Sequence, residues 1–235
     1  SLEMESIKGI SLHYYKYSES SVIAKIFTEN YGLQSYVVNG IRNKTSQNKL
    51  SYLHPLNIVS LEVSANKKKG LPFVKEIRSD HNLSSTFSDM QKKFVCMFIS
   101  EVLMRVLMEK ETDKHLYNFI NKTIFYLNKT EELNKNFVLV FLLKLTEFLG
   151  FHPNKDFSNK DYFDLESGEF TNHPPYYNIR GENKKYLSSL LQNESINIPY
   201  KNRKELIMSL QKYFSLHHYN IEKLKSYEVI ESLRT

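Results

Sequence analysis

The sequence predicts an α+β protein in which a small closed β-barrel, made by residues 1–80, precedes a mainly α-helical domain, residues 81–235. In the first eighty residues, short apolar runs alternate with turn-forming residues, which is typical of consecutive β-strands. From about residue 88 the apolar residues recur with the spacing of a buried helix. The chain contains no internal repeat and no low-complexity segment, so a barrel followed by helices is the simplest plan.

The barrel is expected to contain five strands. Runs with strand character fall at residues 7–17, 22–27, 33–40, 57–63 and 72–78. The sequence Glu-Asn-Tyr-Gly at residues 29–32 tolerates positive φ and therefore favours a turn between the second and third strands. Five short strands with this spacing fit an oligonucleotide-binding (OB) barrel better than an open sheet.

The second domain is expected to contain helices and one small β-hairpin. A helix is expected from about residue 88, and others at residues 114–127, 134–149, 184–191, 201–216 and 221–233. Gly150 and Pro153 follow the third of these and are stop signals for a helix. The segment DYFDLESGEF at residues 161–170 predicts a hairpin that turns at Ser167 and Gly168.

Basic side chains are concentrated in the first third of the chain. The whole sequence has 32 Lys and Arg against 26 Asp and Glu, a formal charge of +6. Residues 1–80 hold 11 basic and 7 acidic side chains, a balance of +4, whereas the remainder holds 21 and 19. A positive barrel favours a polyanionic partner without identifying which one.

One loop of the expected barrel is basic without containing an acid. It lies in the segment VVNGIRNKTSQNKLSYLHPLNIVSL, between two apolar strand-like runs, and presents Arg42, Lys44 and Lys49. A cationic loop between two strands is a place where a phosphate backbone can lie. Ordinary solubilising surface is the alternative interpretation of this loop taken alone.

A second basic segment strengthens the prediction of a nucleic-acid site. Lys67, Lys68 and Lys69 follow the expected fourth strand. In an OB barrel the loop after this strand approaches the face of strands two and three, where OB domains bind oligonucleotides. Single-strand binders add aromatic side chains on which bases stack, and Tyr36 and Tyr52 are the candidates, with packing as the alternative for each.

Several classes of protein are not expected. The single cysteine, Cys96, lies in an apolar run, which excludes a disulfide framework within one chain and favours a reducing, cytoplasmic compartment. No apolar segment reaches the ~20 residues that a membrane-spanning helix needs. The sequence has no glycine-rich phosphate loop and no nucleophile motif, and its histidines and acids are not spaced as metal ligands. We therefore expect no enzyme, no metal and no cofactor.

Four short motifs in the first domain resemble those of the bacterial RecO family, the recombination mediators of DNA repair. They are a Tyr-x-Glu turn at residues 17–19, a Phe-Thr-x-x-x-Gly hairpin at 27–32, a Gly-x-Arg loop at 40–42 and a Leu-x-Pro at 53–55. The resemblance extends from about residue 8 to 229, and the helical part agrees more loosely.

The resemblance implies a DNA-binding protein that makes or breaks no bond. RecO proteins bind single- and double-stranded DNA, anneal complementary strands and contact the acidic tail of single-stranded DNA-binding protein. They act with RecR to load RecA and lie on the nucleoid when bound to DNA. Arg42 and Lys44 occupy positions at which family members carry DNA-contacting basic residues.

The chain departs from many RecO proteins in one respect. Those relatives carry a four-cysteine zinc module after the third long helix, and residues 153–177 of this chain contain no cysteine. Zinc is therefore not expected. A hairpin near residues 160–172 is expected to keep its shape through the packing of Tyr162, Phe163, Leu165 and Phe170.

Two cations of the helical domain are candidates for binding an acidic protein tail. Arg105 and Lys144 each follow apolar helical residues and could rim an apolar pocket. Arg105 is also spaced to pair with Glu101 on the same helix. A protein-interaction scaffold is thus the main alternative function, and an RNA-binding OB protein or a nuclease is the third.

Overall fold

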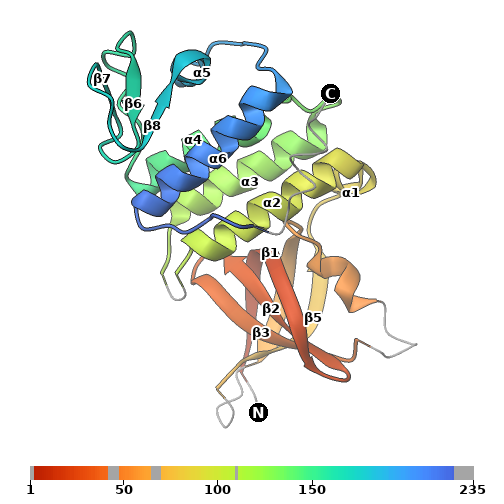
Figure 1. Ribbon diagram of the computed structural model, residues 1–235. Helices are drawn as coiled ribbons and strands as arrows, with labels where there is room; N and C mark the ends of the chain where they lie inside the picture. Colours follow the sequence, from red (N-terminus) through yellow and green to blue (C-terminus); the bar gives the residue numbers. More distant parts are fainter. Residues whose placement is uncertain (1–2, 42–47, 65–69, 109–110, 225–235) are drawn as a thin grey trace. The chain divides into compact units, whose positions relative to one another are not determined.

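The computed structural model describes residues 3–41, 48–64, 70–108 and 111–224 (Figure 1). The chain forms two compact units, Ser1–Glu131 and Glu132–Thr235. Five of the predicted DNA contacts, Arg42, Lys44, Lys67, Lys68 and Lys69, lie outside the described residues. Most of the predicted helix at 221–233 does so as well.

The first unit contains the predicted five-stranded closed barrel. Its elements are β1 (Met4–Ser18), β2 (Ser21–Thr28), β3 (Gly32–Asn39), the 3-10 helix η1 (Lys49–Leu53), β4 (Ile58–Ser64) and β5 (Phe73–Ser79). The strands close in the order β1-β2-β3-β5-β4, and only the β3–β5 pair is parallel. This arrangement confirms the OB-like barrel that the sequence predicts. β1 begins three residues earlier than expected and is the longest of the strands.

The inner and outer faces of the barrel follow from strand alternation. Val22, Ala24 and Ile26 of β2 lie in the core cluster, together with Tyr36 and Val38 of β3. Because successive side chains point to opposite faces, the residues between them point outward. The β2–β3 register pairs Ala24 with Tyr36 on the inner face, and Lys25 with Ser35 on the outer face.

The turn between β2 and β3 requires a glycine. Gly32 has φ +69, and a Cβ there would lie 1.6 Å from the carbonyl oxygen of Glu111. The Thr28 hydroxyl donates to the Gly32 carbonyl at 2.6 Å and accepts from the Tyr31 amide at 3.0 Å. The turn therefore packs directly against the backbone of Glu111, in the segment that precedes the helix at residues 114–129.

Three helices complete the first unit. They are α1 (Ser84–Ser88), α2 (Met90–Val106) and α3 (Lys114–Lys129). Asp89 caps α2 by accepting from the Lys92 amide at 3.0 Å, and Asp113 caps α3 by accepting from the Leu116 amide at 2.9 Å. Tyr117 of α3 packs edge-on against Phe27 of β2, with ring centroids 5.4 Å apart.

Two buried tyrosines of this unit predict a loss of stability at alkaline pH. Burial, with a smaller effect of Glu5, raises the pKa of Tyr36 from 10.0 to about 12, and burial also raises the pKa of Tyr117. The unfolded chain ionises first, so their stabilisation is complete below pH 10 and is lost as pH rises towards 12. In this range we expect the free energy of unfolding to fall by up to about 1.4 kcal/mol for each pH unit and for each of the two tyrosines. Denaturant titrations monitored by tyrosinate absorbance would measure this, and a flat profile would contradict it.

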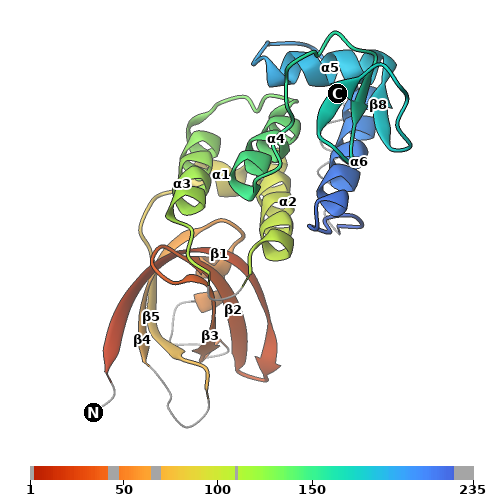
Figure 2. The same cartoon turned by 90° about the vertical axis from the view of Figure 1, so that its left-hand side faces the viewer.

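The described part of the second unit, residues 132–224, contains three helices and a small sheet. Its elements are α4 (Phe137–Leu149), β6 (Tyr162–Asp164), β7 (Glu169–Thr171), β8 (Asn178–Arg180), α5 (Gly181–Leu191) and α6 (Tyr200–Leu216). Gly150 ends α4 in the left-handed conformation, as predicted. The predicted hairpin is formed by β6 and β7, and β8 adds an unpredicted third strand on the other side of β6. α5 follows β8 directly and lies against it (Figure 2).

Aromatic rings form the core beneath this sheet. Phe163 contacts Phe170 and Tyr213 with ring centroids 5.1 and 5.6 Å away. The buried Tyr213 hydroxyl donates to the Phe151 carbonyl, and it approaches Gly168 so closely that a Cβ there would lie 2.8 Å from it. The described residues contain no group of three potential metal ligands.

Candidate nucleic-acid interface

The outward-pointing side chains of β1, β2 and β3 form a polar and aromatic surface, which we call the outer face. It includes His13, Tyr15, Lys25 and Ser35. The strand registers pair His13 with Lys25 and Lys25 with Ser35. The half-buried Lys25 ammonium donates to the Ser35 hydroxyl at 2.7 Å. A fixed cation thus lies at the centre of the face that OB domains use for oligonucleotides.

The second half of β1 leaves the core and remains exposed. Residues 13–18, which we call the exposed end of β1, follow the buried Leu12. The rings of Tyr14, Tyr15 and Tyr17 are 38, 44 and 60% exposed, with Lys16 between them. Exposed aromatic rings interleaved with a cation are typical of surfaces on which single-stranded nucleic acid stacks. The sequence signal for this site is His-Tyr-Tyr-Lys-Tyr, a strand segment without the alternation of buried and polar residues.

The basic loop between β3 and η1 begins and ends beside this segment. The Ile41 amide donates to the Ser20 carbonyl at 3.1 Å, which joins the start of the loop to the β1–β2 turn. The exposed Lys49 ammonium donates to the Asn39 carbonyl at 2.8 Å, which joins the end of the loop to its start. Asn39 pairs with Ser21, the first residue of β2, so Lys49 lies near the β1–β2 turn and the exposed end of β1. Arg42 and Lys44 belong to the part of this loop that is not described.

The structure corrects one predicted contact. Tyr36 is only 3% exposed, and its ring packs in the barrel core against the inner face of β2. A ring in that position cannot stack on a base. Tyr52 is half-buried and packs against the same core. Exposed rings of the barrel include those of Tyr14, Tyr15 and Tyr17 on β1.

The two predicted partner-binding cations lie in different units. Arg105 is exposed in the last turn of α2 in the first unit. Lys144 is exposed on α4 in the second unit and lines a cavity of about 430 Å³, which we call the Lys144 cavity.

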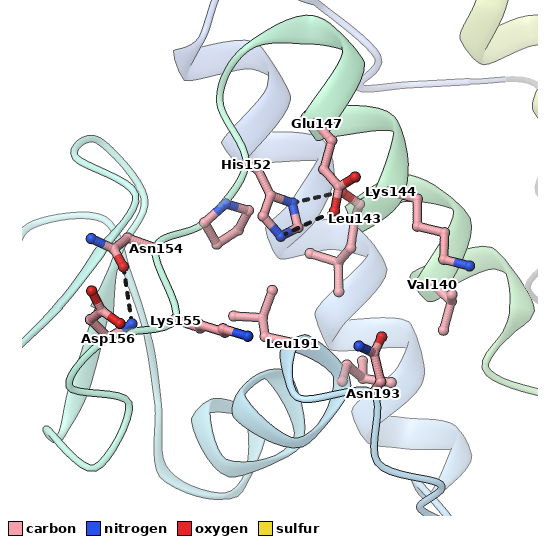
Figure 3. Close-up of a pocket in the computed structure, with 12 residues that line it drawn as sticks. Val140, Leu143, Lys144, Glu147, His152, Asn154, Lys155, Asp156, Leu191 and Asn193 are labelled. Carbon is pink, nitrogen blue, oxygen red and sulfur yellow. Dashed lines mark hydrogen bonds and ion pairs between the residues drawn. The ribbon is translucent and has the colours of Figure 1, made fainter. Parts of the chain in front are cut away.

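The Lys144 cavity combines an apolar floor with a charged rim (Figure 3). The apolar side chains that line it are those of Val140, Leu143, Leu190 and Leu191. Lys144 and Lys155 supply positive charge, and Glu147 and Asp156 supply negative charge. His152 has Nε2 3.7 Å from a Glu147 carboxylate oxygen and Nδ1 3.2 Å from the Leu143 carbonyl oxygen.

Comparison with known proteins gives a consistent result along the chain. The family models "Recombination protein O N terminal" and "Recombination protein O C terminal" match residues 3–81 and 88–228. "DNA repair protein RecO" of Azobacteroides pseudotrichonymphae is 30% identical over 96% of this chain and 97% of its own length. The protein of the same name from Flavobacterium psychrophilum is 28% identical over 96% of this chain and 97% of its own length. That from Bacteroides fragilis is 29% identical over 98% of this chain and 99% of its own length. None of the helices described in the structure is long and apolar enough to cross a membrane.

Proposed function

The chain belongs to the recombination protein O (RecO) family of DNA repair proteins, and from this premise we propose that it is a non-enzymatic recombination mediator. In this proposal it binds single- and double-stranded DNA, anneals complementary strands and acts with RecR to load RecA onto DNA covered by single-stranded DNA-binding protein. The observation that supports the DNA-binding part is the position of the described ends of the basic loop. The Ile41 amide is hydrogen-bonded to the β1–β2 turn, beside the exposed end of β1, and Lys49 is hydrogen-bonded to Asn39.

Annealing is proposed to follow from charge neutralisation. Two DNA strands repel each other through their phosphates, and cations that bind the phosphates lower this repulsion. The described cations on or beside the outer face include Lys25 on β2 and Lys49 at the end of the basic loop. The loop residues Arg42 and Lys44 are proposed to add to them, and so is the lysine run at 67–69.

The proposal is tested by measuring DNA affinity as a function of salt. Because binding releases counterions, the logarithm of the affinity should fall linearly with the logarithm of the salt concentration. The expected slope is about −0.7 for each single-strand phosphate neutralised. In the same buffers the protein should accelerate the annealing of complementary oligonucleotides. Absence of binding at low salt would contradict the proposal.

A separate observation supports a protein partner. The Lys144 cavity offers apolar side chains next to two ammonium groups, which suits an acidic peptide that ends in an aromatic residue. We propose that it receives the acidic tail of single-stranded DNA-binding protein. The tail's carboxylates would lie against Lys144 and Lys155, and its terminal ring would lie on the leucines of the floor. Arg105 stays a candidate contact in the first unit.

Lys144→Glu is expected to weaken the binding of such a peptide roughly tenfold or more. The change replaces a charge-assisted hydrogen bond, which contributes about 1.5–3 kcal/mol, by repulsion. Fluorescence anisotropy with a labelled acidic peptide would measure the effect. Lys135→Glu is the matched control, because Lys135 is exposed just before α4 and does not line the cavity. Equal loss in both variants would show that only net charge matters.

A further inference from the structure

We propose that the rings of His13 and Tyr15 form a slot that takes one unpaired base, so that the barrel distinguishes single-stranded from double-stranded DNA by stacking. This inference rests on the proposed DNA-binding function and gives it a specific contact. The two residues are two positions apart on β1 and both point to the outer face. The slot is defined here by these two rings.

The distance between the rings fits a base. Their centroids are 6.5 Å apart and their planes are 29° from parallel. Stacked bases follow one another at about 3.4 Å along a strand, so a base between two rings needs about twice that distance. The rings are therefore spaced to contact both faces of a single base.

The backbone of β1 explains why these rings are exposed. The β1–β2 register is shifted between Ser11 and His13, which marks a bulge or irregularity. Such features redirect the side chains that follow them and are frequent at binding sites. Leu12, before the shift, is 2% exposed, whereas Tyr15, after it, is 44% exposed. The shift thus separates a core segment of the strand from one available to a ligand.

A cation lies beside the proposed slot on the neighbouring strand. Lys25 is the cross-strand neighbour of His13 on the outer face. At the other end of the hairpin, the Ser20–Ile41 hydrogen bond brings the start of the basic loop to the β1–β2 turn. Tyr17, 60% exposed, offers a further ring along the strand. A strand running along β1 would therefore meet the rings of Tyr15 and Tyr17, with Lys25 beside them on β2.

The slot gives a reason to prefer unpaired DNA. In a duplex each base is already stacked and paired, and taking it out requires a few kcal/mol. An unpaired base can enter without that cost. Phosphate contacts alone, by contrast, are available from both forms of DNA.

The test compares two single-stranded oligonucleotides of equal length. One contains only deoxythymidine, and the other contains only abasic sites, so it keeps the phosphates but has no bases. Wild-type protein should bind the deoxythymidine strand more tightly by about 5-fold to 150-fold, the range expected for one stacked base. Tyr15→Ala should remove most of this difference by weakening only the deoxythymidine complex. Its unchanged affinity for the abasic strand shows that the variant is folded.

Two further variants make the result specific. Tyr15→Phe keeps the ring and should bind both strands within about 2-fold of wild type. Tyr31→Ala removes a ring of similar exposure, 45%, from the β2–β3 turn and should leave the preference for bases intact. Equal wild-type affinity for both strands would overturn the slot and leave charge-driven DNA binding standing. Failure to bind either strand would overturn the proposed function itself.

Discussion

Replacing Arg42, Lys44 and Lys49 together by glutamate is expected to weaken single-stranded DNA binding on the order of a hundredfold at about 0.1 M salt. Each lost phosphate contact removes about 0.7 from the slope of log affinity against log salt, so three contacts remove about 2 log units at this concentration. Repulsion by the new carboxylates adds to the loss. Anisotropy of a labelled oligonucleotide measures the affinity, and the salt slope should become shallower by about 2 in the same titrations.

The control for this variant carries the same change of charge elsewhere. Lys135, Lys185 and Lys201 are exposed in the second unit, and replacing them by glutamate also lowers the net charge by 6. This control should lose much less DNA affinity. Direct contacts between the basic loop and phosphates contribute more to binding than charges elsewhere on the protein, which salt screens. If both triple variants bind equally weakly, the basic loop has no special role in DNA binding.

Phe163→Ala is expected to lower the free energy of unfolding of the second unit by about 3–5 kcal/mol. The Phe163 side chain is fully buried under the three-stranded sheet and contacts two other rings. Its loss leaves a cavity where the sheet meets α6. Chemical denaturation followed by circular dichroism would measure the change in the full chain.

Two controls accompany this variant, and the second tests the expectation that the protein holds no zinc. Phe157→Ala removes a ring that is 68% exposed and should change stability by less than about 0.5 kcal/mol. Treatment of the wild-type protein with a strong chelator should leave its thermal midpoint unchanged, because rings rather than metal ligands hold the sheet. A chelator that lowers the midpoint by several degrees would contradict this account of the module.

The strands of the barrel and the end of α4 could be predicted because their signals are local in the sequence. The direction in which a side chain of β3 points, into the core or out of it, could not. Turn signals and apolar runs predicted the five strands, and stop signals predicted the end of α4. Tyr36 was placed wrongly because residues 33–38 carry apolar groups on both faces. Whether Tyr36 or Val37 points inward depends on the register with β2, which the pattern does not contain.

The features that the sequence did not predict are short or depend on distant segments. β8 has three residues, too few for a recognisable period, and it forms because β6 offers an edge for pairing. The exposed end of β1 depends on where the strand leaves the core. The cavity beside the predicted cation Lys144 depends on the chain beyond α4, because side chains of that segment and of α5 complete its lining. Each of these follows from tertiary packing rather than from local propensity.

The central claim is that DNA lies on the outer face of the barrel, along the exposed end of β1 and the basic loop. Hydrogen–deuterium exchange of the full chain, with and without saturating single-stranded DNA, tests it most directly. We predict slower exchange on DNA binding at residues 13–18, at the β1–β2 turn and at residues 39–50, with little change at residues 132–224. Protection confined to residues 132–224 would contradict the claim.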